Sequence, residues 1–158
     1  FADPPYNLQL SGDLRRPDYD PHAALAANAR NADAVLRLLA LRGGRGLVAT
    51  GSVFEAGEGG GDTTPLNAYG LAKTLTWHSL RFHAERHGLA VGRFVIPHPF
   101  GPLEKPGFTS ALAAAWLAGG PGLVRRPNLV RDLVPVELLA LAYAQLCRRI
   151  TPGKVVGA

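Results

Sequence analysis

The sequence contains no methionine and only one cysteine, Cys147. A single cysteine excludes an internal disulfide framework and a thiolate cluster for zinc, so we expect no metal centre, with Cys147 buried in a helix. No apolar run approaches the ~18 residues that a membrane-spanning helix needs, and nothing resembles a signal peptide. We therefore expect a cytoplasmic protein with no membrane partner. Because Phe1 opens a chain without methionine, we also expect these residues to be a fragment.

Lysine is scarce, and most of the net charge of +5 comes from arginine. The 17 basic residues are spread along the chain and form no block, so we interpret the charge as a general positive surface and expect no nucleic-acid partner. The chain has 158 residues, 47% of them hydrophobic. This length is enough for one packed domain and short for two.

Apolar residues at helical spacing alternate with short apolar runs bounded by glycine or proline. Asp20 followed by Pro21 is typical of a helix start, and Gly43 of a helix end. The alternation of strands and helices predicts an α/β fold with a parallel sheet. The expected elements are a helix over 20–42, a strand over 47–50, a helix over 65–87, a strand over 90–96, a helix over 109–118, a strand over 129–134, a helix over 135–149 and a strand over 154–156.

The helix after Pro65 carries an apolar stripe at helical spacing: Leu71, Leu75, His78 and Phe82. This stripe predicts the buried face of that helix, with His78 packed in the core and not catalytic. The same reasoning places Asn28 on the inner side of the first helix.

Tyr69 and Lys73 lie four residues apart on this helix and therefore share one face. A phenol with an unperturbed pKa of ~10 is a poor base at neutral pH, but an adjacent ammonium favours the phenolate and lowers that pKa. The pair could thus move a proton on or off a substrate hydroxyl. The spacing alone is weak evidence. Its context strengthens it, because Thr50 closes a buried strand and a glycine-rich loop, 57–61, leads to the helix.

Five segments, in one consistent order over about 140 residues, resemble the extended short-chain dehydrogenases/reductases of the NAD-dependent epimerase/dehydratase family. Thr50-Gly51-Ser52-Val53-Phe54-Glu55 is similar to a strand end in which Ser or Thr precedes Val-Tyr-Gly. Tyr69-Gly-Leu-Ala-Lys73 matches the Tyr-x-x-x-Lys motif. The others are the helical Asn28, Pro97-His98-Pro99-Phe100-Gly101-Pro102 for Asn-x-Tyr-Gly-Pro, and Arg131-Asp132-Leu133-Val134-Pro135-Val136 for Arg-Asp-Phe-Val-x-Val.

The resemblance implies a role for each matching residue. Tyr69 would be the acid/base, Lys73 would bind the nicotinamide ribose and tune Tyr69, and Thr50 would position the reacting hydroxyl. Asn28 would shape its helix and relay protons, and Pro97 would line the cofactor. The implied reaction transfers a hydride from a sugar carbon to bound NAD or NADP, and the keto product is epimerised, dehydrated or reduced.

The departures from the family pattern concern the substrate. Phe54 and Glu55 replace Tyr-Gly, and His98 stands where Asn commonly holds the nucleotide-sugar. Ser52 occupies the place of a catalytic Glu in the 4,6-dehydratases, which weighs against a dehydratase. The resemblance thus makes Ser52, His98 and Arg131 candidate contacts to a nucleotide-sugar or a related substrate.

The glycine-rich turn that holds a dinucleotide pyrophosphate between a strand and a helix does not occur in this sequence. We therefore expect a partial Rossmann-like parallel sheet that lacks its first strands, over 19–104, and part of a small C-terminal substrate lobe, over 105–158. Such a fragment alone should be inactive and bind cofactor poorly. The resemblance also implies a homodimer of the full-length protein.

The irregular first segment, 1–18, carries a different signal. Asp3-Pro4-Pro5-Tyr6 resembles the motif of cell-cycle-regulated DNA adenine methyltransferases, in which such residues hold a flipped base. One alternative is therefore a DNA methyltransferase fragment, although no loop for S-adenosylmethionine is recognisable. A second alternative is a catalytically dead Rossmann-like scaffold.

Overall fold

The computed structural model describes residues 23, 26, 31–58, 63–104, 107–125, 127–128, 130, 132–152 and 155–157. They divide into two compact units, one with the residues up to Ile96 and from Tyr143 on, the other from Pro97 to Ala142. The elements are α2 (Ala32–Leu41), β1 (Gly46–Ser52), α3 (Ala68–Arg86), β2 (Ala90–Ile96), β3 (His98–Phe100), α4 (Phe108–Leu117), β4 (Leu133–Pro135), α5 (Val136–Arg149) and β5 (Val155–Gly157).

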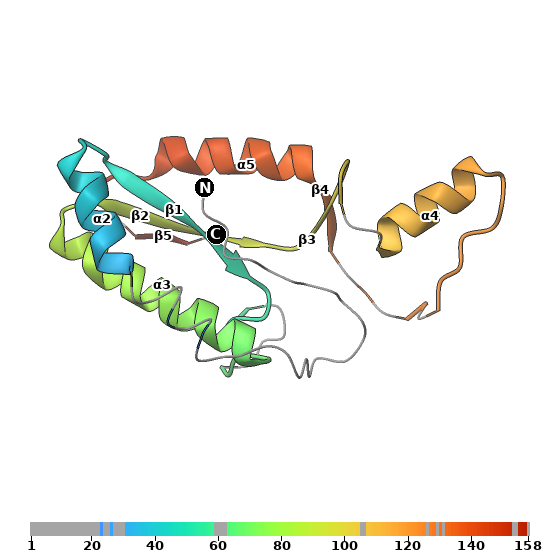
Figure 1. Cartoon of the computed structure of the whole chain (residues 1–158), viewed down its shortest axis with the longest axis horizontal. Helices are drawn as coiled ribbons and strands as arrows, with labels where there is room; N and C mark the ends of the chain where they lie inside the picture. Colours follow the sequence, from blue (N-terminus) through green and yellow to red (C-terminus); the bar gives the residue numbers. More distant parts are fainter. Residues whose placement is uncertain are drawn as a thin grey trace. The chain divides into compact units, whose positions relative to one another are not determined.

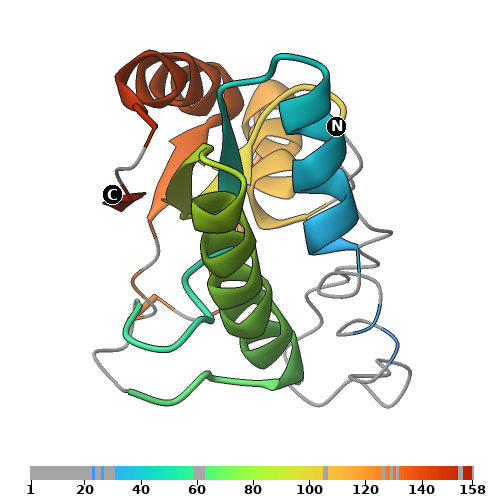
Figure 2. The ribbon, with the colours of Figure 1, turned by 90° about the vertical axis from the view of Figure 1, so that its left-hand side faces the viewer.

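The first unit is built on a parallel sheet with the strand order β1-β2-β5. Gly46 pairs with Ala90 and Ser52 with Ile96, so β1 and β2 end together at one edge of the sheet. Helices α2 and α3 cover one face, and the part of α5 from Tyr143 on covers the other (Figures 1 and 2). The predicted α/β class with a parallel sheet is confirmed.

The core of this unit lies between the sheet and α2 and α3. Its buried side chains come from all these elements, and Leu36 is fully buried. Removing such apolar area from water contributes roughly 25 cal/mol per Å². The cluster contains Leu36, Trp77, Ala84, Leu89 and Val91, with Leu39, Ala40, Leu47, Ala49 and Leu80 packed around it.

The helix boundaries follow local chemistry. α2 ends before Gly43, which has a φ of 75°, a conformation that glycine adopts without strain. Asn67 caps α3, because its Oδ1 accepts a hydrogen bond from the Gly70 amide at 2.9 Å. The predicted end at Gly43 and the predicted second helix are confirmed. The predicted start at Asp20 lies outside the described residues.

The predicted buried face of α3 is wrong. Leu71, Leu75 and Phe82 are exposed, and His78 is exposed as well, so it is not packed in the core. The residues that α3 buries are mostly small: Gly70, Ala72, Trp77 and Ala84. Small side chains bring a helix backbone close to a sheet, so the larger apolar side chains are left on the outer side. Cys147, expected to be buried, is also exposed, on α5.

The second unit holds the two-stranded parallel sheet of β3 and β4 and the helix α4. Pro99 lies within β3, although the sequence suggested that prolines only end the strand before it. Proline is tolerated here because, among the described strands, β3 pairs only with β4. A strand was predicted over 129–134, and in the described structure β4 covers 133–135. The bounds of α4 and α5 agree with the predicted helices to within one residue. No helix among the described residues is long and apolar enough to cross a membrane.

Candidate functional site

Thr50 lies near the carboxyl end of β1, at the edge where open α/β sheets bind their ligands. The ammonium of Lys73 donates a hydrogen bond to the Thr50 carbonyl oxygen at 3.0 Å. This bond joins α3 to the end of β1. The structure therefore brings together two of the residues that the sequence analysis had assigned to one site.

Tyr69 is the second residue of α3, and Lys73 follows one turn later. The Lys73 Nζ lies 5.9 Å from the centre of the Tyr69 ring. The unsatisfied amides at a helix start carry partial positive charge, and an ammonium within about 6 Å adds to it. The structure thus places the Tyr69 ring at the start of α3 and beside the ammonium of Lys73.

Close packing at Gly70 fixes where α3 begins. A Cβ built on Gly70 would lie 1.9 Å from the Phe54 carbonyl oxygen, which accepts a hydrogen bond from the Leu66 amide. The Phe54 ring meets the Tyr69 ring edge to face, with 6.2 Å between the ring centres. Phe54 stands where the family has Tyr, and here it supports the phenol of Tyr69.

Ser52 and Glu55 shape the turn that follows β1. Glu55 is 1% exposed, and its Oε1 accepts a hydrogen bond from the Ser52 amide at 2.6 Å. The Ser52 hydroxyl accepts one from the Phe54 amide at 3.3 Å. The Ser52 oxygen thus contributes to the turn itself, and its hydroxyl hydrogen is the part that could be offered to a substrate.

Sequence reasoning missed the charges that hold this turn. Arg93 on β2 contacts Glu55 at 3.0 Å and Glu58 at 2.5 Å, and its guanidinium lies 5.3 Å from the centre of the Trp77 ring. Glu55 takes the place of the small family glycine because Arg93 neutralises it. The only signal for this pair was a charged residue inside an apolar strand.

Tyr143 on α5 was also missed. Its hydroxyl lies 2.6 Å from Thr50 Oγ1, and its ring meets Phe94 edge to face at 4.7 Å. Phe94 is the register partner of Thr50 on the neighbouring strand. Tyr143 therefore contacts paired residues on two neighbouring strands, Thr50 on β1 and Phe94 on β2.

The remaining predicted site residues lie either outside the described residues or in the second unit. Asn28 and Arg131 lie outside the described residues, as do Asp3, Pro4 and Tyr6 of the methyltransferase-like segment. Pro97 and His98 belong to the second unit, where the His98 amide donates to the Asp132 carbonyl oxygen at 2.9 Å. Among the described residues, no group of three His, Cys, Asp or Glu side chains could hold a metal ion.

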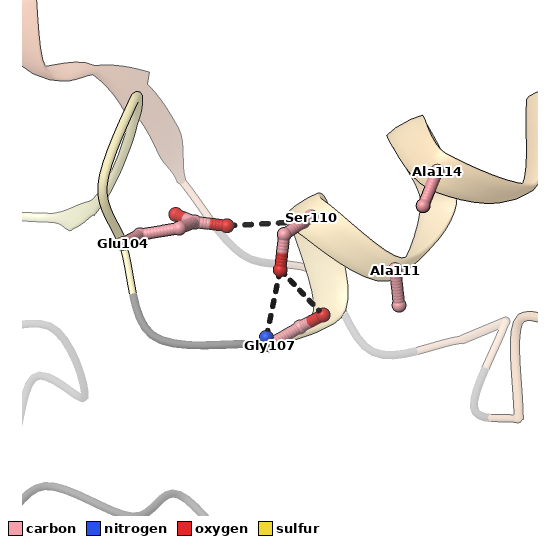
Figure 3. Close-up of a pocket in the computed structure, with 5 residues that line it drawn as sticks. All are labelled: Glu104, Gly107, Ser110, Ala111 and Ala114. Atoms are coloured by element: carbon pink, nitrogen blue, oxygen red, sulfur yellow. Dashed lines mark hydrogen bonds between the residues drawn. The ribbon is translucent and has the colours of Figure 1, made fainter. Parts of the chain in front are cut away.

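An open hollow in the second unit lies beside the start of α4 (Figure 3). Glu104 accepts hydrogen bonds there from the Thr109 hydroxyl at 2.5 Å and from the Ser110 amide at 3.0 Å. These bonds, chiefly the one from Thr109, hold the pKa of Glu104 below its usual value. The carboxylate occupies the place that an anionic ligand would take at a helix start, so this hollow is not a phosphate site.

A family model described as the NAD dependent epimerase/dehydratase family matches residues 4–156. The chain belongs to this family. The match confirms the resemblance carried by the Tyr69 and Thr50 segments. The match begins at residue 4, within the segment 1–18, and does not test the resemblance of that segment to the methyltransferase motif. A comparison with curated proteins found no significant match.

Solved structures of related enzymes share the fold at low identity. The UDP-glucose 4-epimerase of Thermotoga maritima with UDP-glucose aligns with a TM-score of 0.66 and 18% identity, over 88% of this chain and 49% of that chain. The dTDP-glucose 4,6-dehydratase DesIV of Streptomyces venezuelae gives 0.63 and 17%, over 87% and 46%. The Bordetella bronchiseptica enzyme WbmG with NAD and UDP gives 0.64 and 20%, over 90% and 46%. The chain thus spans about half the length of these enzymes.

Proposed function

We propose that the protein, in its full natural length, uses NAD or NADP to epimerise, dehydrate or reduce a nucleotide-linked sugar or a related hydroxyl or keto compound. The observation that carries the proposal is the hydrogen bond of 3.0 Å from Lys73 to the Thr50 carbonyl oxygen. It joins the Tyr69 helix to the sheet edge that carries a hydroxyl side chain. An acid/base and a hydrogen-bond donor thereby come from two rigid elements.

Tyr69 is the proton-transferring residue in this proposal. Its phenolate would remove the proton from the substrate hydroxyl while the carbon that bears this hydroxyl loses a hydride, for which NAD(P) would be the acceptor. The charge of Lys73 and the start of α3 are proposed to stabilise that phenolate when it forms. The phenol returns the proton when the carbonyl is reduced, so one residue serves both directions.

Thr50 is proposed to bind the same substrate oxygen as Tyr69. Its hydroxyl donates a hydrogen bond to the oxygen that Tyr69 deprotonates, which fixes the substrate and steadies the charge that develops there. The backbone of Thr50 is held by Lys73, which lies one turn after Tyr69 on α3. Asn28 is proposed to shape its helix and pass protons from Tyr69 toward solvent.

The residues present suit the nicotinamide ribose half of the cofactor. Lys73 carries an ammonium, one of whose protons is donated to the Thr50 carbonyl oxygen, and Tyr69 a hydroxyl; ammonium and hydroxyl groups bind ribose hydroxyls. Pro97, which follows β2 in the sequence, is proposed to line the same part. Bound NAD(P) supplies the acceptor for the hydride. The glycine-rich turn for its pyrophosphate is not part of this sequence.

The substrate contacts are proposed from Ser52, His98 and Arg131. Arginine is suited to a diphosphate because its guanidinium can hold two oxygens at once. His98 replaces the family asparagine and would offer a ring nitrogen to the sugar or nucleotide. Ser52 has no carboxylate to assist loss of water, which favours epimerisation or reduction over dehydration.

A homodimer through α3 is part of the proposal. The outer side of that helix exposes Leu71, Leu75 and Phe82. We propose that these exposed apolar side chains form the contact surface of the dimer. We also propose that the protein works in the cytoplasm.

The test is turnover by the protein in its full natural length. It is incubated with NAD or NADP and a panel of UDP- and dTDP-sugars, and the sugar products are followed by NMR. We expect conversion of at least one nucleotide-sugar, and loss of about 10²-fold or more in kcat for Tyr69→Phe. A folded, cofactor-bound protein that converts none of them would instead support the inactive scaffold. Equal activity of the Tyr69→Phe variant would contradict the assignment of the base.

A further inference from the structure

The hydroxyl of Thr50 has a protein partner on the face of the sheet opposite α3. Tyr143 reaches it from α5, with 2.6 Å between the two oxygens and 93 residues between them in sequence. Both side chains are partly buried. Nothing in the family motifs assigns a role to this position.

The direction of this hydrogen bond follows from acidity. A phenol has a pKa of ~10, far below that of an aliphatic alcohol, so it is the better donor of the two. Tyr143 therefore donates and Thr50 Oγ1 accepts. The 2.6 Å separation lies at the short end of the range for O–H···O bonds.

The geometry of Tyr143 is held by its ring. Phe94 meets it edge to face at 4.7 Å and 88°, a favourable aromatic arrangement. Because Phe94 and Thr50 are register partners on β2 and β1, the ring and the hydroxyl of Tyr143 contact neighbouring positions of the sheet. The phenol is thus preorganised for Thr50.

We propose that Tyr143 is a positioning residue that orients the Thr50 hydroxyl for donation to the substrate oxygen. With one lone pair of Thr50 occupied by Tyr143, its single hydrogen points to another acceptor. Lys73 holds the carbonyl of the same residue, so Thr50 is fixed from two helices. A hydroxyl that accepts one bond also donates a stronger one, by about 10–30% in condensed-phase estimates. This inference rests on the proposed function.

The kinetic test uses Tyr143→Phe, Thr50→Val and the double variant of the protein in its full natural length. We expect Tyr143→Phe to lower kcat about tenfold, with the KM for the sugar and the Kd for NAD(P) unchanged within about twofold. The double variant should be no slower than Thr50→Val, because Tyr143 acts only through Thr50. Cys147→Ser, an exposed change on the same helix, serves as the control with unchanged rates. Losses that multiply in the double variant would overturn the proposal.

A second readout does not depend on turnover. The hydroxyl proton of Tyr143 should be observed by NMR as a slowly exchanging signal, and it should exchange at least tenfold faster in Thr50→Val. Unchanged exchange would overturn the proposal whatever the kinetics show. If the wild-type protein has no turnover, the proposed function fails and the positioning role with it, while this signal still reports whether the contact exists.

Discussion

Lys73 donates a hydrogen bond of 3.0 Å to the carbonyl oxygen of Thr50, across 23 residues of sequence. The bond connects the first turns of α3 to the carboxyl end of β1. It places a positive charge beside the Tyr69 ring and holds the strand that carries a candidate hydroxyl donor. One contact therefore serves both the packing of a helix on a sheet and the chemistry proposed at their junction.

Replacing Lys73 by methionine removes this bond and the charge beside Tyr69. We expect kcat of the protein in its full natural length to fall by about 10²-fold or more, because the proposed phenolate loses the cation beside its ring. The measurement is the initial rate of nucleotide-sugar conversion. Arg81→Met is the matched control, since it removes an exposed positive charge from the same helix. Similar losses in both variants would show that the general charge of α3 matters and not Lys73.

Gly70→Ala tests the close packing of α3 against the turn after β1. Alanine is a better helix former than glycine, so the change would be stabilising in open space. Here its Cβ would meet the Phe54 carbonyl oxygen at 1.9 Å. We expect a net loss of about 1–3 kcal/mol in the free energy of unfolding, measured by urea denaturation.

Gly120→Ala is the control for this change. The nearest atom to its added Cβ is the Ala115 carbonyl oxygen at 3.6 Å, an ordinary contact. This variant should change the unfolding free energy by less than about 0.5 kcal/mol. If Gly70→Ala were equally harmless, the packing at Phe54 would be looser than described.

Arg93→Met tests the buried ion pair between Arg93 and Glu55, beside the turn that follows β1. It leaves the Glu55 carboxylate, which is 1% exposed, without its cation. Breaking such a pair from one side costs about 3–5 kcal/mol. We expect a loss of this size in urea denaturation, and a smaller loss when Glu55→Gln is added to Arg93→Met, because the unpaired charge is then gone.

Arg37→Met on α2 provides the comparison for Arg93→Met, since Arg37 is exposed. Its effect should stay within about 0.5 kcal/mol. If the loss of unfolding free energy in the Glu55→Gln/Arg93→Met variant equalled the sum of the losses in the two single variants, Glu55 and Arg93 would not interact.

The contacts of Asp33 with two histidines should make the stability of the fold depend on pH. It contacts His87 at 2.8 Å and His83 at 3.1 Å, and chiefly the hydrogen bond from His87 holds the pKa of Asp33 below its ordinary 3.8. A depressed folded-state pKa stabilises the fold above the unfolded pKa, and this contribution is lost as pH falls through the folded value. Asp33→Asn should therefore lower Tm at pH 6 and lose its effect at strongly acid pH. A difference from wild type that grows toward acid pH would contradict this contact.

Much of the fold could be predicted because it depends on short-range patterns. The run at 47–50 and the proline after Ile96 mark β1 and β2, and Gly43 and Gly88 mark helix ends. The burial of α3 could not be predicted from hydrophobicity. Its inner side is formed by small residues such as Ala72 and Ala84, which pack closely but contribute little to an apolar stripe.

The residues of the candidate site also include some that the sequence predicted and some that it did not. Tyr69, Lys73 and Thr50 were predicted because the family motifs order them along the sequence. Tyr143 could not be, since its contact with Thr50 joins residues 93 apart and depends on how α5 lies on the sheet. The role of Glu55 was missed for a similar reason, because its partner Arg93 lies on the next strand.

The most direct test of the account is the position of two hydroxyls in a crystal structure of the full natural protein with NAD(P) and a nucleotide-sugar. We predict that the Tyr69 and Thr50 hydroxyls both lie within about 2.6–3.2 Å of one sugar oxygen, since proton transfer requires hydrogen-bond reach to a shared atom. Lys73 should remain bonded to the Thr50 carbonyl oxygen beside them. Hydroxyls that point to different parts of the ligand, or a ligand bound away from the end of β1, would contradict the proposed function.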